Sequence, residues 1–251
     1  MATKHPLGKR PRGESGLPVA GGGSDAGGVE LLDRQDFVAM NRGTCQMHEA
    51  DEVREQIIKR SREILKASKQ AIFALHRNNG AEAEKLMERA EEIGTELVQL
   101  TTANPTLREG ALSAAFEEFV EAKCFWYYLE TGRLISRRQL PPAIQKHEYL
   151  GGVIDFTGEL MRYAVVKATA RDVAAVEQCR AIVDAISGEL IQFDFRNGSL
   201  RRKFDSIKYN LRKLENTLYE LSLVTSTGVA LQANSTEEIP SASGVEAEEE
   251  E

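Results

Sequence analysis

Apolar residues recur every three or four positions through most of residues 48–224, which is the spacing of an α-helix. No stretch of useful length alternates apolar and polar residues as a half-buried strand would. The pattern predicts helices over 48–78, 82–103, 104–131, 148–168, 172–188 and 199–224. The breaks between them carry Asn78-Asn79-Gly80, Asn104-Pro105 and Pro141-Pro142, residue types that end or start helices. We therefore expect an all-α protein, a bundle of six to seven helices.

The first and last predicted helices carry the most regular stripes of small and apolar residues. The first stripe consists of Ile57, Ser61, Ile64, Ser68, Ile72 and Leu75. The last consists of Leu200, Phe204, Ile207, Leu211, Leu214, Leu218 and Leu221. The strict three-four alternation of the last stripe is typical of a coiled coil, so this helix requires a partner helix.

Composition divides the chain into a helical domain, residues 47–224, and two tails that we expect to be disordered. Residues 1–46 are rich in Gly, Pro and Ser, and residues 225–251 hold seven acidic and no basic residues. Neither tail can bury enough apolar surface to order itself. Residues 48–224 hold 26 basic and 27 acidic residues, so the net charge of −7 does not exclude a nucleic-acid partner.

Two features bear on where the protein works. No run approaches the roughly 20 apolar residues of a membrane span, so we expect no membrane association. The cluster Lys9, Arg10 and Arg12 reads either as a nuclear import signal or as a solvated tail. We expect a protein of the cytoplasm and the nucleus.

Four carboxylates stand in two helix-spaced pairs. Glu118 and Glu121 lie in FEEFVEAKCF, and Asp155 and Glu159 lie in GGVIDFTGELMR. Residues three or four apart share one face of a helix, so the four acids converge if the two helices pack together. Such a cluster needs a cation or shared protons, and oxygen ligands suit Mg²⁺, with Mn²⁺ as the alternative. The hypothesis is a metal-dependent nuclease in which these four residues bind the metal and catalyse.

Other interpretations of these acids stay open. They could form a solvated face, or a tight helix crossing at Gly151, Gly152 and Gly158 in which Arg162 neutralises them. A di-iron site is disfavoured because it needs Glu-x-x-His twice, and none of His48, His76 and His147 has a Glu three residues before it.

Basic residues supply candidate contacts to a nucleic-acid backbone. The candidates are Lys69, Arg77, Arg162, Arg201 and Arg202. Such rows also occur as solvated faces paired with local acids. The aromatic run Phe125–Tyr128 either packs in the core or offers a ring on which an unpaired base stacks.

Four stretches carry a resemblance to a known family. They are SREILKASKQAIFALHR (61–77), EEFVEAKCFWYYLETGRLIS (117–136), YLGGVIDFTGELMR (149–162) and NGSLRRKFDSIKYNLRKLENTLYELS (197–222). With these the chain resembles the translin family, most of all its nuclease branch, translin-associated factor X (Trax). The pattern DxTGELMR is that of Trax, whereas translin has an apolar residue where Asp155 stands.

The resemblance implies a seven-helix bundle that assembles with translin into a closed, hollow octamer. It implies Mg²⁺-dependent cleavage of single-stranded RNA by Glu118, Glu121, Asp155 and Glu159, with small-RNA passenger strands or transfer-RNA fragments as substrates. Two features depart from Trax. The connection between Ile135 and Tyr149 is shorter than in animal Trax proteins, and the stretch from residue 197 is closer to translin. A non-catalytic, translin-like subunit that binds single-stranded RNA or DNA is the alternative, and a helical scaffold is a third.

Overall fold

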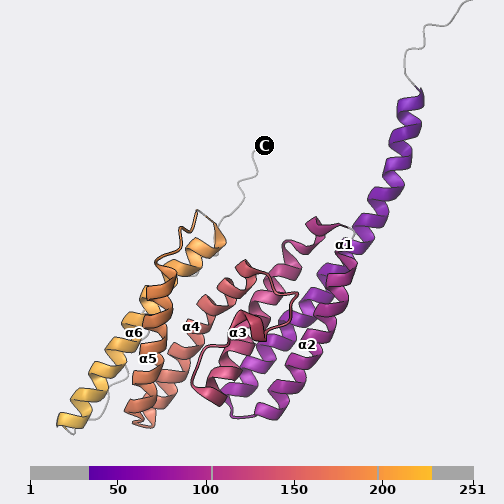
Figure 1. Cartoon of the computed structure of the whole chain (residues 1–251). Coiled ribbons are helices and arrows are strands. Elements are labelled where there is room, and N and C mark those ends of the chain that lie inside the picture. Colours follow the sequence, from indigo (N-terminus) through magenta and orange to yellow (C-terminus); the bar gives the residue numbers. More distant parts are fainter. Residues whose placement is uncertain (1–33, 103, 197, 228–251) are drawn as a thin grey trace, which may run out of the picture. The chain divides into compact units, whose positions relative to one another are not determined.

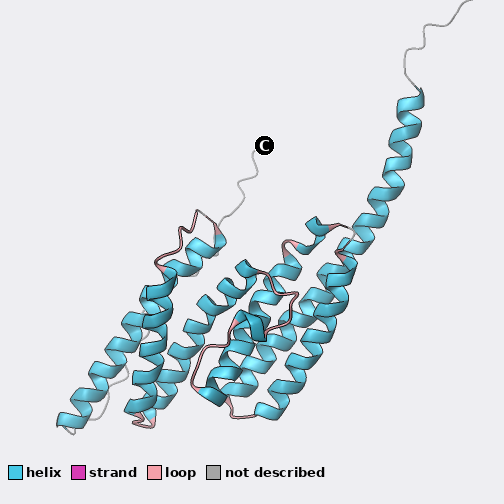
Figure 2. Ribbon diagram, viewed as in Figure 1, coloured by secondary structure: helices cyan, strands magenta, loops and turns pink. Residues whose placement is uncertain are grey.

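The computed structural model describes residues 34–102, 104–196 and 198–227, and these residues form helices joined by short loops, without any strand (Figure 2). The α-helices are α1 (Arg34–His76), α2 (Gly80–Leu100), α3 (Ala111–Thr131), α4 (Lys146–Thr169), α5 (Val173–Leu190) and α6 (Ser199–Thr227). Two short 3₁₀ helices, η1 (Pro105–Arg108) and η2 (Arg137–Gln139), lie in the connections. The predicted all-α class is confirmed. Within the described residues no helix is both long and apolar enough for a membrane span.

The chain divides into two units, Met1–Met47 and His48–Glu251, and the division falls within α1. α1 begins at Arg34, so it includes residues 34–46 of the segment predicted to be a tail, and the disorder of that segment stays a prediction. The Gly- and Pro-rich composition ends at Gly28, and residues 34–46 contain no proline that would stop a helix. The rest of that predicted tail, with its basic cluster, lies outside the described residues, as do residues 228–251.

In the second unit, α4 is the central helix. It packs against α3 on one side and against α5 and α6 on the other, while α2 packs on α3 (Figure 1). Ion pairs join α1 to α2, with Arg60 Nη2 lying 2.5 Å from Glu96 Oε2. All six residues of the predicted first stripe are buried. In the last stripe Ile207, Leu214 and Leu221 are buried and the other members are half-buried, so the required partner helices are α4 and α5.

The third predicted helix is interrupted. The range 104–131 begins with η1, and α3 starts only at Ala111. Glu109 is extended and Gly110 has φ +82°, a left-handed conformation that glycine adopts without strain. The prediction of one continuous helix is therefore wrong at Glu109-Gly110.

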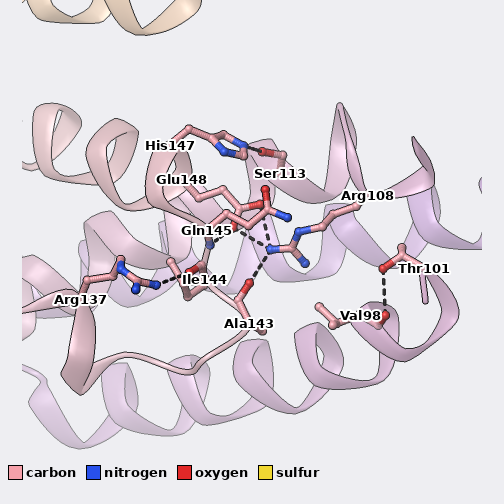
Figure 3. A network of polar contacts seen from close by, with 10 residues as sticks. All are labelled: Val98, Thr101, Arg108, Ser113, Arg137, Ala143, Ile144, Gln145, His147 and Glu148. Atoms are coloured by element: carbon pink, nitrogen blue, oxygen red, sulfur yellow. Dashed lines mark hydrogen bonds and ion pairs between the residues drawn. The ribbon is translucent and has the colours of Figure 1, made fainter. Parts of the chain in front are cut away.

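The interruption lets η1 anchor the start of α4 (Figure 3). Arg108 Nη2 donates to Glu148 Oε2 at 2.7 Å and to the carbonyl oxygen of Ala143 at 2.6 Å, and Glu148 is completely buried. Ser113 Oγ and His147 Nε2, 2.9 Å apart, join α3 to the same end of α4. A buried carboxylate left without its partner is strongly destabilising, so these contacts fix α4 along α3.

Gly151 and Gly152 are the points at which α4 meets α3. A Cβ atom at Gly152 would lie 2.6 Å from both the carbonyl oxygen of Glu117 and Cβ of Val120. A Cβ atom at Gly151 would lie 2.7 Å from the carboxylate of Glu117. Gly158 differs, since a Cβ atom there would lie 3.8 Å from its nearest neighbour, Nδ2 of Asn210, which is ordinary van der Waals contact. Close approach therefore explains the first two glycines but not the third.

Gly152→Ala should lower the free energy of unfolding by about 1–3 kcal/mol, because the added methyl group meets backbone rather than a movable side chain. Gly158→Ala is the matched control and should be neutral or stabilising by up to about 1 kcal/mol, through helix propensity alone. Urea unfolding of both variants tests this. Equal stability of the Gly152 variant and the wild type would contradict the packing described.

Candidate active site

The four predicted acids gather where α1, α3 and α4 meet. Glu118 and Glu121 of α3 and Glu159 of α4 line one cleft of about 610 Å³. Its other lining residues come from α1 and α4 and are Lys69, Ile72, Phe73, His76, Arg162 and Val166. Asp155 does not line the cleft, but its charge acts on Glu118 and Glu121. The crossing at Gly152 thus brings both predicted acid pairs into one region.

Glu121 is the most perturbed of these acids. It is 8% exposed, and burial raises its pKa to about 9, with further contributions from the negative charges of Asp155, Glu118 and Glu159. A carboxyl group with this pKa keeps its proton at neutral pH unless a positive charge comes close. A cation brought close to Glu121 would favour the loss of this proton.

Glu118 and Asp155 are also harder to ionise than usual. Burial raises the pKa of Glu118, and the ammonium of Lys69, 3.4 Å away, opposes the rise. Burial raises the pKa of Asp155 as well, against the hydrogen bond and charge of Lys203. In both cases a neighbouring lysine favours the charged form, against the effect of burial.

Lys203 of α6 bridges two carboxylates from different helices. Its Nζ donates to Asp155 Oδ2 on α4 and to Glu117 Oε2 on α3, the second at 2.5 Å. Burial lowers the pKa of Lys203, but the hydrogen bonds and charges of Asp155 and Glu117 outweigh it, and the net change is a rise. Sequence reasoning missed both Glu117 and Lys203 as site residues. Glu117 could have been found, because it stands four residues before Glu121 and so shares its helix face.

Glu159 has two cationic or polar neighbours. His76 Nε2 lies 2.6 Å from its Oε2, and Arg162 Nη1 lies 3.0 Å from its Oε1. His76 also packs on Phe125, with ring centroids 4.6 Å apart. Sequence analysis considered His76 only as a ligand of the disfavoured di-iron site, because a contact across 83 positions leaves no local signal.

The acids around the cleft match a divalent metal ion in ligand type but not in arrangement. Among the described residues no three His, Cys, Asp or Glu side chains form a group ready to hold one. The acids near the cleft nevertheless offer only carboxylate oxygens, the ligands that Mg²⁺ and Mn²⁺ prefer, and a cation beside Glu121 would favour the charged form of its carboxyl group. The carboxylates are therefore of the chemical type that binds such an ion. In this structure, however, the acids pair with basic side chains instead, namely Lys69, His76, Arg162 and Lys203.

The predicted nucleic-acid contacts divide into two groups. Lys69 and Arg162 line the cleft, and Arg77 lies 5.3 Å from the ring of Phe73, another lining residue. Arg201 pairs with Asp205 at 3.5 Å, and Arg202 is exposed on α6, but neither lines the cleft.

The aromatic run Phe125–Tyr128 does not line the cleft either. Phe125 and Tyr128 are buried, and Trp126 and Tyr127 are half-buried against the core. The core-packing interpretation of this run is therefore the correct one, and the aromatic residue at the cleft is Phe73.

Glu121→Gln should be more stable than the wild type, by a margin that grows with pH. The folded wild type keeps a proton on Glu121 that the unfolded chain releases above pH 4.5, so its stability falls until Glu121 ionises in the folded state near pH 9. The ratio of the two unfolding constants should change by up to about tenfold per pH unit in this window. Denaturant unfolding from pH 5 to 9 measures it, with the exposed Glu130→Gln as control. A difference that does not vary with pH would contradict the raised pKa.

Comparison with known proteins identifies relatives of this helical domain. The model of the translin family matches residues 52–224. The translin-associated protein X homolog of Schizosaccharomyces pombe is 26% identical over 193 residues, which cover 69% of this chain and 82% of that protein. Human translin is 28% identical over 119 residues, 43% of this chain, and chicken translin is 28% identical over 111 residues. These two matches span only about half of the relatives' own length, 52% and 48%.

Solved structures show the same fold. The crystal structure of AfC3PO superposes with a TM-score of 0.68 at 23% identity, covering 74% of this chain and 98% of that one. The structure of AfC3PO in complex with duplex RNA gives a TM-score of 0.67 at 22% identity, covering 75% and 99%. Because the family model covers more than half of its residues, the chain belongs to the translin family.

Proposed function

We propose that this protein is the catalytic subunit of a metal-dependent endoribonuclease that cuts single-stranded RNA, assembled with translin in a hetero-oligomer. The observation that carries the proposal is the buried carboxyl group of Glu121, held among Glu118, Asp155 and Glu159 beside an open cleft. Membership of the translin family, the similarity to a Trax homolog and the solved complex of AfC3PO with duplex RNA support RNA as the ligand.

The proposed metal ligands are Glu118, Glu121, Asp155 and Glu159. When bound there, Mg²⁺ or Mn²⁺ would neutralise phosphate charge and lower the pKa of a water molecule so that it can attack phosphorus. The remaining contributions come from the chain itself. Burial keeps bulk water away from Glu121, and the low exposure strengthens every electrostatic interaction around it.

Basic residues around the acids position the substrate and the carboxylates. Lys69 and Arg162 are exposed at the cleft, where they can pair with phosphates on either side of the cleaved bond. Lys203 holds Asp155 in place, and His76 holds Glu159. His76 can also pass a proton to or from Glu159 across their 2.6 Å contact.

A non-catalytic subunit that binds single-stranded RNA or DNA is the second candidate. It is favoured by the pairing of Glu159 with Arg162 and of Asp155 with Lys203, which neutralises two acids without a metal. Against it stands Glu121, since a protein that only binds a polyanion gains nothing from a buried carboxyl group beside its binding cleft.

Glu121→Gln and Glu118→Gln should each lower the rate of RNA cleavage at least about a hundredfold while helicity and assembly are retained, since each removes a charged ligand. The assay follows a labelled single-stranded RNA with the full-length protein, alone and mixed with translin, in Mg²⁺ or in EDTA. Glu130→Gln, an exposed glutamate on the same helix, is the control and should cut at the wild-type rate. Binding of RNA without cutting in every mixture would establish the second candidate instead.

A further inference from the structure

Phe73 combines two properties that rarely occur together. Its side chain is 63% exposed, yet it lines the cleft that contains Glu118, Glu121 and Glu159. Exposing a phenyl ring to water is unfavourable, and the other exposed residues of this cleft are Lys69, Arg162 and the smaller apolar Val166, which is 56% exposed. A ring in this position is explained if something flat and apolar covers it when the cleft is in use.

The position of Phe73 on α1 places the ring beside the reacting groups. Lys69, Phe73 and His76 are spaced four and three residues apart, so they form one stripe on the helix surface. His76 at the end of this stripe contacts Glu159 at 2.6 Å. Phe73 therefore lies one helical turn from His76, whose partner Glu159 is a proposed metal ligand. It lies one turn in the other direction from Lys69, whose ammonium is 3.4 Å from Glu118.

A positive charge also lies next to the Phe73 ring. The guanidinium of Arg77 lies 5.3 Å from the centre of the Phe73 ring. A guanidinium there can pair with a phosphate or stack on a base next to the one that covers the ring. The stripe thus offers alternating cationic and aromatic contacts, the combination used to bind unpaired nucleic acid.

We propose that Phe73 is the stacking platform for one unpaired nucleobase next to the cleaved phosphate, with Arg77 and Lys69 contacting the flanking phosphates. This inference rests on the proposed function and adds the reason for a single-stranded substrate. A base can lie flat on the ring only when it is free of a pairing partner, so a duplex cannot use this contact. Because every base has an aromatic face, the contact selects unpaired RNA without selecting its sequence.

The surroundings favour a nucleobase over a protein partner. Charged residues are depleted from the core of protein interfaces. The neighbours of Phe73 in the cleft include Lys69, Arg162 and three glutamates, with Arg77 directly over the ring. Docking of a protein there would bury all of these charges, whereas a nucleotide chain supplies both the flat apolar surface and the phosphates that pair with the cations.

The test measures RNA binding by the full-length chain carrying Glu121→Gln, which keeps the RNA intact. The probe is a short oligouridine with one 2-aminopurine, whose fluorescence reports stacking, at fixed salt. Adding Phe73→Ala should weaken binding by about 5- to 150-fold and remove the fluorescence change, whereas Phe73→Trp should keep both. Tyr219→Ala is the matched control, because Tyr219 is 64% exposed on α6 and does not line the cleft. Affinity for an RNA duplex should be unchanged by Phe73→Ala.

Other outcomes separate this inference from the proposed function. If the Glu121→Gln chain with Phe73 intact does not bind the oligouridine at all, the proposed function fails and the inference fails with it. If it binds and Phe73→Ala binds equally well, the inference alone is overturned. If Phe73→Ala and Phe73→Trp both change the oligomer size in gel filtration while Tyr219→Ala does not, Phe73 is an assembly contact, and the inference is again overturned.

Discussion

The close approach of α3 and α4 at Gly152 is the constraint on which the rest of the structure depends. With no side chain at this position, the backbone of Glu117 can lie against α4, and the acids of α3 come alongside those of α4. Five carboxyl groups from two helices then share one region, and burial raises the pKa of three of them, Glu118, Glu121 and Asp155. A fold that accepts this crossing must bring cations from elsewhere in the chain.

Those cations come from the helices on either side of the crossing. Lys203 of α6 reaches Asp155 and Glu117, while Lys69 and His76 of α1 reach Glu118 and Glu159. The packing of α1 and α6 is therefore electrostatic as well as apolar. Glu121 is the member whose pKa these residues leave highest, which is why we place the missing positive charge of a metal ion beside it. The buried carboxyl group of Glu121 therefore affects both the stability of the fold and the proposed catalysis.

Sequence analysis predicted most of what depends on local spacing. The stripe from Ile57 to Leu75 is buried, and the two acid pairs occupy one region because helix periodicity fixes which residues share a face. Contacts between distant helices could not be predicted in the same way. The pairing of Lys203 with Asp155 spans 48 positions and that of His76 with Glu159 spans 83, and neither leaves a periodic signal.

The aromatic residue at the cleft was expected within Phe125–Tyr128, next to the acids in sequence, whereas Phe73 reaches the cleft from another helix. At Gly158 a glycine inside a helix suggested a close contact between helices, and the structure does not contain that contact.

The central claim is that the cleft holds a divalent cation that Glu121 helps to bind. The most direct measurement is the thermal unfolding temperature of the wild type and of Glu121→Gln across a Mg²⁺ titration at pH 8, with ionic strength held constant by potassium chloride. A ligand that binds only the folded state stabilises it by an amount that grows with its concentration. We predict a rise in unfolding temperature with Mg²⁺ for the wild type and little or none for Glu121→Gln. An unfolding temperature that Mg²⁺ leaves unchanged in the wild type, or raises equally in both proteins, would contradict the claim.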